Sequence, residues 1–333
     1  MMNQHLIAID LDGTTLNNQS QLSSLTIRTL RKLSELGHMV CIVTGRPYRT
    51  SIDIYHQLGI QSPMVNFNGA YCHFPNRPDW IPSYHKELDR EIALELFADH
   101  QELDVDLICA EGINQLYTSS MKLPESPYYP MDDAKYVKLS RQTLIHNPIA
   151  LTLFTSEECQ APIQARILAK YGDDVSVRTW GGEYPVLEVV HAGIHKAIGV
   201  KTIADFYHIP RTNIYSFGDE DNDLEMIDYA GHGVAMKNAI DSVKAIADHE
   251  TRYTNDEDGL ARFLIEAFSL EIWPFCFALV PLIGYTEGEV WKESSWKEWW
   301  NGDVHSRPIS SSLSPWLWGL LNDPYAFITT DFL

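Results

Sequence analysis

Two aspartates at the end of a short apolar run constrain the fold of this chain more than any other feature. Residues 6–9, Leu-Ile-Ala-Ile, predict a buried strand, and Asp10, Asp12 and Gly13 follow it directly. Side chains two positions apart in a strand point the same way, so the two carboxylates would repel each other and lose water. That is costly unless a cation or a shared proton compensates. An ordinary polar turn is the alternative, because Asp-Gly is a common turn pair.

Further apolar runs along the chain also end in polar residues. Residues 39–43 precede Thr44-Gly45, and residues 214–217 precede Gly218-Asp219. Helical patterns separate these runs, and strands that alternate with helices indicate parallel βαβ units. We therefore expect an α/β fold whose core is a doubly wound, Rossmann-like parallel sheet. Ligands bind such sheets beyond the carboxyl ends of the strands, where these polar residues lie.

The pattern changes between about residues 84 and 190. We expect helices over 89–102 and 162–171, together with several short strands. The strands are predicted at 105–109, 150–154, 175–179 and 185–190. This composition indicates a separate α+β domain inserted into the sheet domain. The predicted division is core 1–83, insert 84–190, core 191–269 and a C-terminal segment 270–333.

Composition excludes several classes of function. The net charge of −20 argues against nucleic acid and against an anionic membrane surface as partners. The five cysteines are scattered and form no Cys-x-x-Cys pair, so we expect neither a disulfide framework nor a zinc site. The first residues show no signal peptide pattern, and we expect a reducing, cytoplasmic location.

The polar residues at the strand ends and helix starts have complementary chemistry. Carboxylate and carbonyl oxygens favour a hard cation such as Mg²⁺ over zinc. A threonine hydroxyl, backbone amides and a lysine suit a phosphate group. A carboxylate can also act as a nucleophile and form an aspartyl phosphate, provided that nearby positive charge masks it. The oxygen donors are Asp10, Asp12, Asp219, Asn222 and Asp223, and the candidate phosphate binders are Thr44, Gly45 and Lys196.

Four motifs in this order resemble those of the haloacid dehalogenase superfamily of phosphatases. Asp10-Leu11-Asp12-Gly13-Thr14 resembles motif I, and Thr44-Gly45-Arg46 at a strand end resembles motif II. Lys196 corresponds to motif III, and Gly218-Asp219-x-x-Asn222-Asp223 to motif IV. The insert between the second and third motifs is similar to the class IIB cap of the Cof-type branch. The resemblance covers about residues 5–269.

The resemblance implies roles for single residues. Asp10 would be the nucleophile, and Asp12 the general acid and then the general base. Mg²⁺ would be bound by Asp10, the backbone carbonyl of Asp12 and Asp219, with help from Asp223. The phosphoryl group would be held by Thr44, Gly45, Lys196 and Asn222. Arg46 would also hold it under one of two interpretations of that residue.

Several alternatives remain open at single positions. Arg46 either contacts phosphate or pairs with an acidic neighbour, since a strand-end arginine has many possible partners. His195 either touches substrate or lies on the surface at a helix start. Trp180 and the pair Tyr128-Tyr129 either line a substrate pocket in the insert or belong to its core.

The expected function is that of a Mg²⁺-dependent phosphatase acting on a small phosphorylated metabolite. A sugar phosphate, pyridoxal phosphate or a flavin-related phosphate are the substrates that the resemblance implies. One alternative is a phosphomannomutase-like phosphoryl transferase, and another is a binding or regulatory protein that has lost catalysis. The intact set of Asp10, Asp12, Lys196 and Asp219 favours an enzyme. We expect a monomer or a weak homodimer.

The C-terminal segment differs in composition from the rest of the chain. Seven of the nine tryptophans lie between Trp273 and Trp318. The segment shows neither helical nor strand periodicity, and its apolar run is too short to span a bilayer. It has no counterpart in the resemblance. It either packs on the sheet domain or a second subunit, or it is a non-native extension; in both cases we expect no contribution to the active site.

Overall fold

The computed structural model describes residues 4–124, 136–179 and 185–272. The residues up to Ile272 form one compact unit. The expectations for Tyr128, Tyr129, Trp180 and the tryptophan-rich segment fall outside the described residues and stay predictions.

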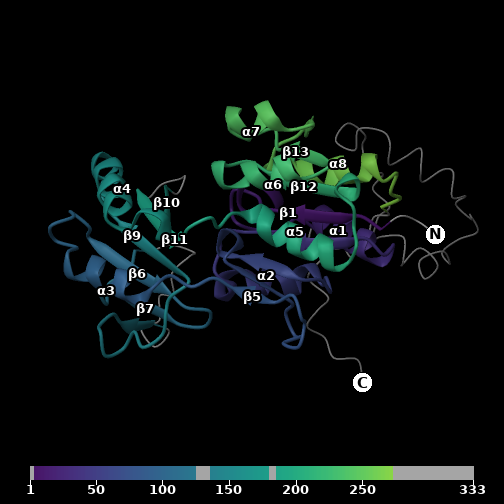
Figure 1. Cartoon of the computed structure of the whole chain (residues 1–333). Helices are drawn as coiled ribbons and strands as arrows, with labels where there is room; N and C mark the ends of the chain where they lie inside the picture. The colour runs from purple at the N-terminus through teal and green to yellow at the C-terminus, as the bar shows by residue number, and fades with distance from the viewer. Residues whose placement is uncertain (1–3, 125–135, 180–184, 273–333) are drawn as a thin grey trace, which may run out of the picture. The chain divides into compact units, whose positions relative to one another are not determined.

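A parallel five-stranded sheet forms the core, in the order β14-β13-β12-β1-β2 (Figure 1). A bridge between Val43 and Val65 adds the neighbouring strand β3, which begins a small antiparallel sheet β3-β4-β5. The core strands are β1 (Leu6–Ile9), β2 (Met39–Ile42), β3 (Met64–Asn66), β4 (Tyr71–His73), β5 (Tyr84–His85), β12 (Ile214–Gly218), β13 (His232–Ala235) and β14 (His249–Glu250).

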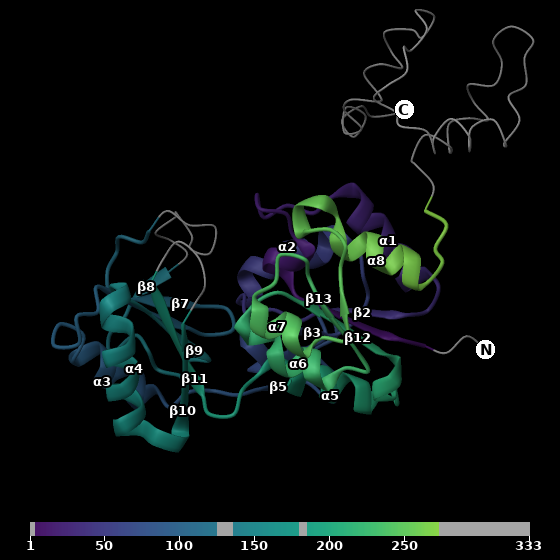
Figure 2. The ribbon, with the colours of Figure 1, turned by 90° about the horizontal axis from the view of Figure 1, so that it is seen from above.

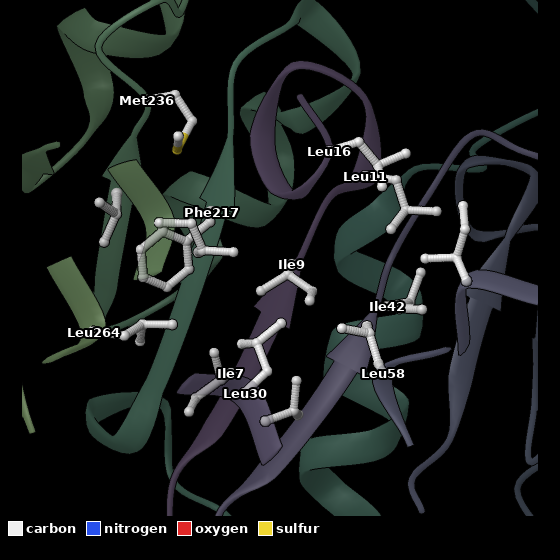
Figure 3. Close-up of a cluster of buried hydrophobic side chains, with 14 of the residues drawn as sticks. Ile7, Ile9, Leu11, Leu16, Leu30, Ile42, Leu58, Phe217, Met236 and Leu264 are labelled. Carbon is white, nitrogen blue, oxygen red and sulfur yellow. The ribbon is translucent and has the colours of Figure 1, made fainter. Parts of the chain in front are cut away.

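Helices cover both faces of the parallel sheet (Figure 2). All four residues of β1 are apolar and buried, as expected for a strand covered on both sides. Ile7 and Ile9 pack with Leu30 of α1 in one buried cluster (Figure 3), whereas Leu6 and Ala8 face α5 in another. The core helices are α1 (Ser24–Glu35), α2 (Tyr48–Leu58), α5 (Lys196–Phe206), α6 (Leu224–Tyr229), α7 (Asp241–Ile246) and α8 (Gly259–Ala267). The expected doubly wound parallel sheet is confirmed.

An α+β cap is inserted between β5 and α5. Its sheet has six strands in the order β10-β11-β9-β6-β7-β8 and is antiparallel except for the pair β7-β8. Two helices, α3 and α4, pack on one face of this sheet through an apolar cluster. The cap elements are α3 (Arg90–Ala98), β6 (Leu107–Glu111), β7 (Leu116–Thr118), β8 (Tyr136–Lys138), β9 (Ala150–Phe154), α4 (Glu157–Tyr171), β10 (Val175–Thr179) and β11 (Val186–His191).

Two predicted cap helices differ from the structure at their ends. Helix α4 begins at Glu157 and contains Pro162, so the expectation that this proline starts the helix was wrong. Helix α3 ends at Ala98, short of the predicted Glu102. The predicted domain boundaries themselves stay predictions. None of the helices in the described part of the chain is both long and apolar enough to span a bilayer.

Candidate active site

The predicted aspartates meet at the carboxyl edge of the parallel sheet. Strands β1 and β12 are parallel neighbours, and the backbone N–H of Asp10 donates to the Phe217 carbonyl at 3.1 Å. Asp219 follows β12 directly, so it lies beside Asp10 although 209 positions separate them in the sequence. Both side chains are buried, and so is Asp223.

Three carboxylates and one lysine form the centre of the site. Oxygen atoms of Asp10, Asp219 and Asp223 lie within 4.8 Å of one another. The fully buried Lys196 donates from Nζ to Asp10 Oδ1 and to Asp223 Oδ1, each at 2.6 Å. The three carboxylates carry more negative charge than one ammonium group can balance. An oxygen-lined site with excess negative charge fits a hard divalent cation.

Burial changes the protonation of two of these groups. Burial raises the pKa of Asp10 to about 7, against the opposing effect of the Lys196 ammonium. Burial also raises the pKa of Asp219 to about 8, and the neighbouring Asp10 adds to the shift. Burial opposes the charge on Lys196, but Asp10 and Asp223 raise its pKa above the ordinary value. Without further positive charge, the site would therefore hold protons near neutral pH.

The loop after β1 fixes the orientation of Asp219. Thr14 donates from its hydroxyl to Asp219 Oδ1 at 2.8 Å. Gly13 has a φ of +69°, and a Cβ at this position would lie 2.1 Å from Asp219 Oδ2. Only glycine combines this backbone conformation with so close an approach. The Asp-x-Asp-Gly-Thr stretch thus holds the motif IV aspartate in place.

Asp12 has a different environment from Asp10. Arg46 donates from Nε to Asp12 Oδ2 at 2.7 Å and from Nη2 to Asp12 Oδ1 at 2.5 Å. Of the two alternatives for Arg46, the structure contains the ion pair with an acidic neighbour. The Asp12 carboxylate is not part of the acidic cluster, and the role of its backbone carbonyl toward a metal stays a prediction.

Asn68 connects the candidate phosphate-binding residues. Asn222 donates to Asn68 Oδ1 at 3.0 Å, and a Cβ on Gly45 would lie 3.0 Å from the same oxygen. The Asn68 backbone N–H donates to the Thr44 carbonyl at 3.1 Å. Thr44, Gly45 and Asn222, which come from two distant loops, therefore lie around one residue, Asn68.

Glu188 is a site residue that sequence reasoning missed. It lies on β11 of the cap with 3% of its surface exposed, and it accepts a hydrogen bond from Asn68 Nδ2 at 2.7 Å. A signal was present, since Glu188 interrupts the apolar run Val-Leu-Glu-Val-Val. His195, whose position was left open, is half-buried directly before α5.

Comparisons with known proteins show the family to which the chain is similar. Residues 7–264 match the model of a family described as haloacid dehalogenase-like hydrolase. The chain is 39% identical over 267 residues to the 5-amino-6-(5-phospho-D-ribitylamino)uracil phosphatase YitU of Bacillus subtilis, covering 80% of this chain and 98% of that protein.

Solved structures show the same fold. A haloacid dehalogenase-like hydrolase from B. subtilis is 26% identical with a TM-score of 0.65, covering 78% of this chain and 99% of that one. A subclass IIB sugar phosphatase is 22% identical with a TM-score of 0.65, covering 80% of this chain and 99% of that one.

Proposed function

The chain belongs to the haloacid dehalogenase-like hydrolase family and is a phosphatase, and we propose that it uses Mg²⁺ and forms an aspartyl-phosphate intermediate. The observation that carries the proposal is the buried cluster of Asp10, Asp219 and Asp223 around Lys196. Its carboxylates suit a hard cation, and its lysine suits a phosphoryl group.

Asp10 is the proposed nucleophile. Its carboxylate attacks the phosphorus, the bond from phosphorus to the alcohol oxygen breaks, and Asp12 gives that oxygen a proton. Asp12 then takes a proton from a water whose oxygen attacks the aspartyl phosphate, which releases inorganic phosphate and restores Asp10. Because Arg46 holds both oxygens of Asp12, these proton transfers require that Asp12 leaves Arg46 during turnover.

The remaining site residues would bind the cation and the phosphoryl group. Asp10, Asp219 and the Asp12 carbonyl would hold Mg²⁺, with Asp223 assisting. Bound Mg²⁺ would mask the negative charge of the nucleophile and of the phosphate. Lys196, already between Asp10 and Asp223, is placed to hold a phosphoryl oxygen. Thr44, Gly45, Asn222 and, once released from Asp12, Arg46 are the other proposed phosphate ligands.

The substrate that we propose to test first is a phosphorylated ribityl compound. The similarity to YitU over nearly that protein's whole length supports this choice over the other sugar phosphates and pyridoxal phosphate. We further propose that the protein acts in the cytoplasm as a monomer or weak homodimer. The free and buried thiols of Cys41, Cys72 and Cys109 are compatible with a reducing compartment.

Hydrolysis of p-nitrophenyl phosphate tests the proposed chemistry. The full chain should release nitrophenol with Mg²⁺ and lose this activity in EDTA. An Asp10→Asn variant should be slower by roughly four to six orders of magnitude, as when other enzymes lose their nucleophile. The same variant should fold at least as well as wild type, because one carboxylate leaves a crowded acidic cluster. A near-normal kcat for Asp10→Asn would refute the aspartyl-phosphate route.

A panel of phosphorylated metabolites then tests the substrate class. We expect the highest kcat/KM for 5-amino-6-(5-phospho-D-ribitylamino)uracil, with release of inorganic phosphate. Transfer of the phosphoryl group to a second sugar instead of water would favour the phosphomannomutase-like alternative.

A further inference from the structure

Glu188 is a buried carboxylate that the proposed chemistry does not use. Among the residues that the structure describes, Asn68 alone donates a hydrogen bond to it, at Oε2, and it takes part in no ion pair. Arg178, its neighbour across the sheet, donates instead to Glu225 at 2.9 Å. Burial raises the pKa of Glu188, although the hydrogen bond from Asn68 opposes this shift. A carboxylate so buried has capacity for further hydrogen-bond donors at Oε1.

The cap sheet presents Glu188 on the face that carries no helices. Side chains alternate along β11, so Leu187 and Val189 pack in the apolar cluster with α3 and α4 while Glu188 points to the opposite face. Thr152 is paired with Glu188 on the adjacent strand β9 and is buried as well. A leucine or valine at position 188 would continue the apolar run of this strand. The burial of a charged group there therefore calls for a partner.

Glu188 lies next to the proposed phosphate-binding loops. Asn68 donates to Glu188 and accepts from Asn222, so one side chain separates the cap carboxylate from the motif IV loop. Asn68 also packs against Gly45. A phosphoryl group held by these loops would extend its alcohol part away from Asp10. The carboxylate repels the phosphate itself, but it attracts neutral donors such as hydroxyl groups.

We propose that Glu188 selects substrates by accepting a hydrogen bond from a hydroxyl group on the alcohol part of a polyol monophosphate. This inference rests on the proposed function and narrows its substrate class. A site built to bind a substrate hydroxyl discriminates strongly against an analogue without it, because the buried acceptor is then left unpaired. Glu188 thus favours polyol phosphates over alkyl phosphates of equal length.

Ribitol 5-phosphate and n-pentyl phosphate provide a matched pair of substrates, since both have five carbons and only the first carries further hydroxyl groups. Wild type should show a higher kcat/KM for ribitol 5-phosphate. Glu188→Gln, which keeps the shape and an acceptor for Asn68, should lower kcat/KM for ribitol 5-phosphate by roughly tenfold to a hundredfold. It should change kcat/KM for n-pentyl phosphate by less than about threefold, within the range of a small packing effect.

Glu111→Gln is the control variant. Glu111 is also a buried carboxylate on the cap sheet, but Arg49 binds both its oxygens, at 3.2 and 2.5 Å. Its loss should leave the ratio of the two kcat/KM values near that of wild type. The inference would be overturned if Glu188→Gln left the ratio of the two kcat/KM values at its wild-type value, either because neither value changed or because both fell equally. Equal losses would make Glu188 a positioning residue for Asn68 and Asn222.

Failure of the proposed function has a different signature. In that case wild type hydrolyses neither p-nitrophenyl phosphate nor the matched pair, and the inference falls with it. Should Glu188→Gln not fold, wild type still decides the question with deoxy analogues of ribitol 5-phosphate. Removal of one hydroxyl should then lower kcat/KM by about tenfold or more. A series in which no hydroxyl matters overturns the inference.

Discussion

Asp10 and Asp12 lie only two positions apart in the sequence, but their side chains have different surroundings. Asp10 is buried beside Lys196, whereas the Asp12 side chain is 39% exposed and is held by Arg46. If Asp12 protonates the leaving oxygen, Asp12→Ala should slow alkyl phosphates by roughly a hundredfold to ten-thousandfold. The loss for p-nitrophenyl phosphate should be clearly smaller, because nitrophenolate leaves without a proton.

Steady-state kinetics with a series of esters of decreasing leaving-group pKa would measure this difference. The slope of log kcat against that pKa should be steeper for the variant than for wild type. Parallel slopes would mean that Asp12 does not act as the acid.

His73 is a buried histidine near the second motif. Its Nε2 lies 3.0 Å from Asn66 Oδ1, and its ring stacks on Tyr71 and contacts the Tyr48 ring edge-on. Burial lowers the pKa of His73 to about 4. The unfolded chain takes up a proton near the ordinary pKa of about 6.5, so stability is lost as the pH falls from there toward 4.

This pH dependence can be measured by urea unfolding of wild type and His73→Gln. Between pH 7 and pH 5, wild type should lose about 2 kcal/mol more of its free energy of unfolding than the variant does. Because other groups titrate equally in both proteins, the difference isolates His73. If the free energy of unfolding had the same pH dependence in both proteins, folding would not lower the pKa of His73.

We propose that the cap determines substrate specificity, and exchanging the cap with that of a relative tests this. Tyr84 and His85 pair with β4 of the core, so the exchange should begin after them, at Leu88, and end at His191. A hybrid with the cap of a sugar phosphatase relative should acquire that relative's substrate ranking while its Mg²⁺ requirement persists. The ranking and metal dependence of kcat/KM are the measurements. An unchanged ranking would place specificity in the core.

Periodicity predicted the longer helices and strands, and strand-end chemistry predicted which residues meet at the sheet edge. Neither predicted the individual side-chain hydrogen bonds between distant segments. Strands β9 and β10 have the predicted bounds because both are continuous or alternating apolar runs. Strands of two or three residues, such as β5 and β7, are too short to show a period. Helix α4 begins before Pro162, at Glu157, because Glu157 and Glu158 in its first turn interact favourably with the positive end of the helix dipole.

The site shows the same division. The contact between Asp10 and Lys196 was predictable, because strand ends and helix starts at one edge of the sheet lie close together. For Arg46, local sequence did not distinguish an ion pair with an acidic neighbour from a contact with phosphate. The hydrogen bond from Asn68 to Glu188 joins residues 120 positions apart, one in the turn after β3 and one on β11 of the cap, and no local pattern encodes it.

At the scale of the whole chain, the question is where the folding unit ends. The last described contacts of the core come from Phe268 and Leu270, both partly buried in the cluster around β1. Phe268 also packs edge-on against His5 and His38, at ring distances of 5.2 and 4.9 Å. The predicted end of the core at Ser269 would remove Leu270. An end at residue 272, where the compact unit stops, keeps both side chains.

A chain of residues 1–272 should therefore fold and hydrolyse p-nitrophenyl phosphate with the kcat of the full chain. A shorter chain ending at Ala267 is the matched control, because it loses Phe268 and Leu270. It should be less stable by about 2 kcal/mol, part of the free energy gained by burying two large apolar side chains. Urea unfolding and kcat of the three proteins decide the matter. If the 1–272 chain were insoluble or inactive while the full chain worked, residues 273–333 would contribute to the fold, and the predicted independence of the C-terminal segment would be wrong.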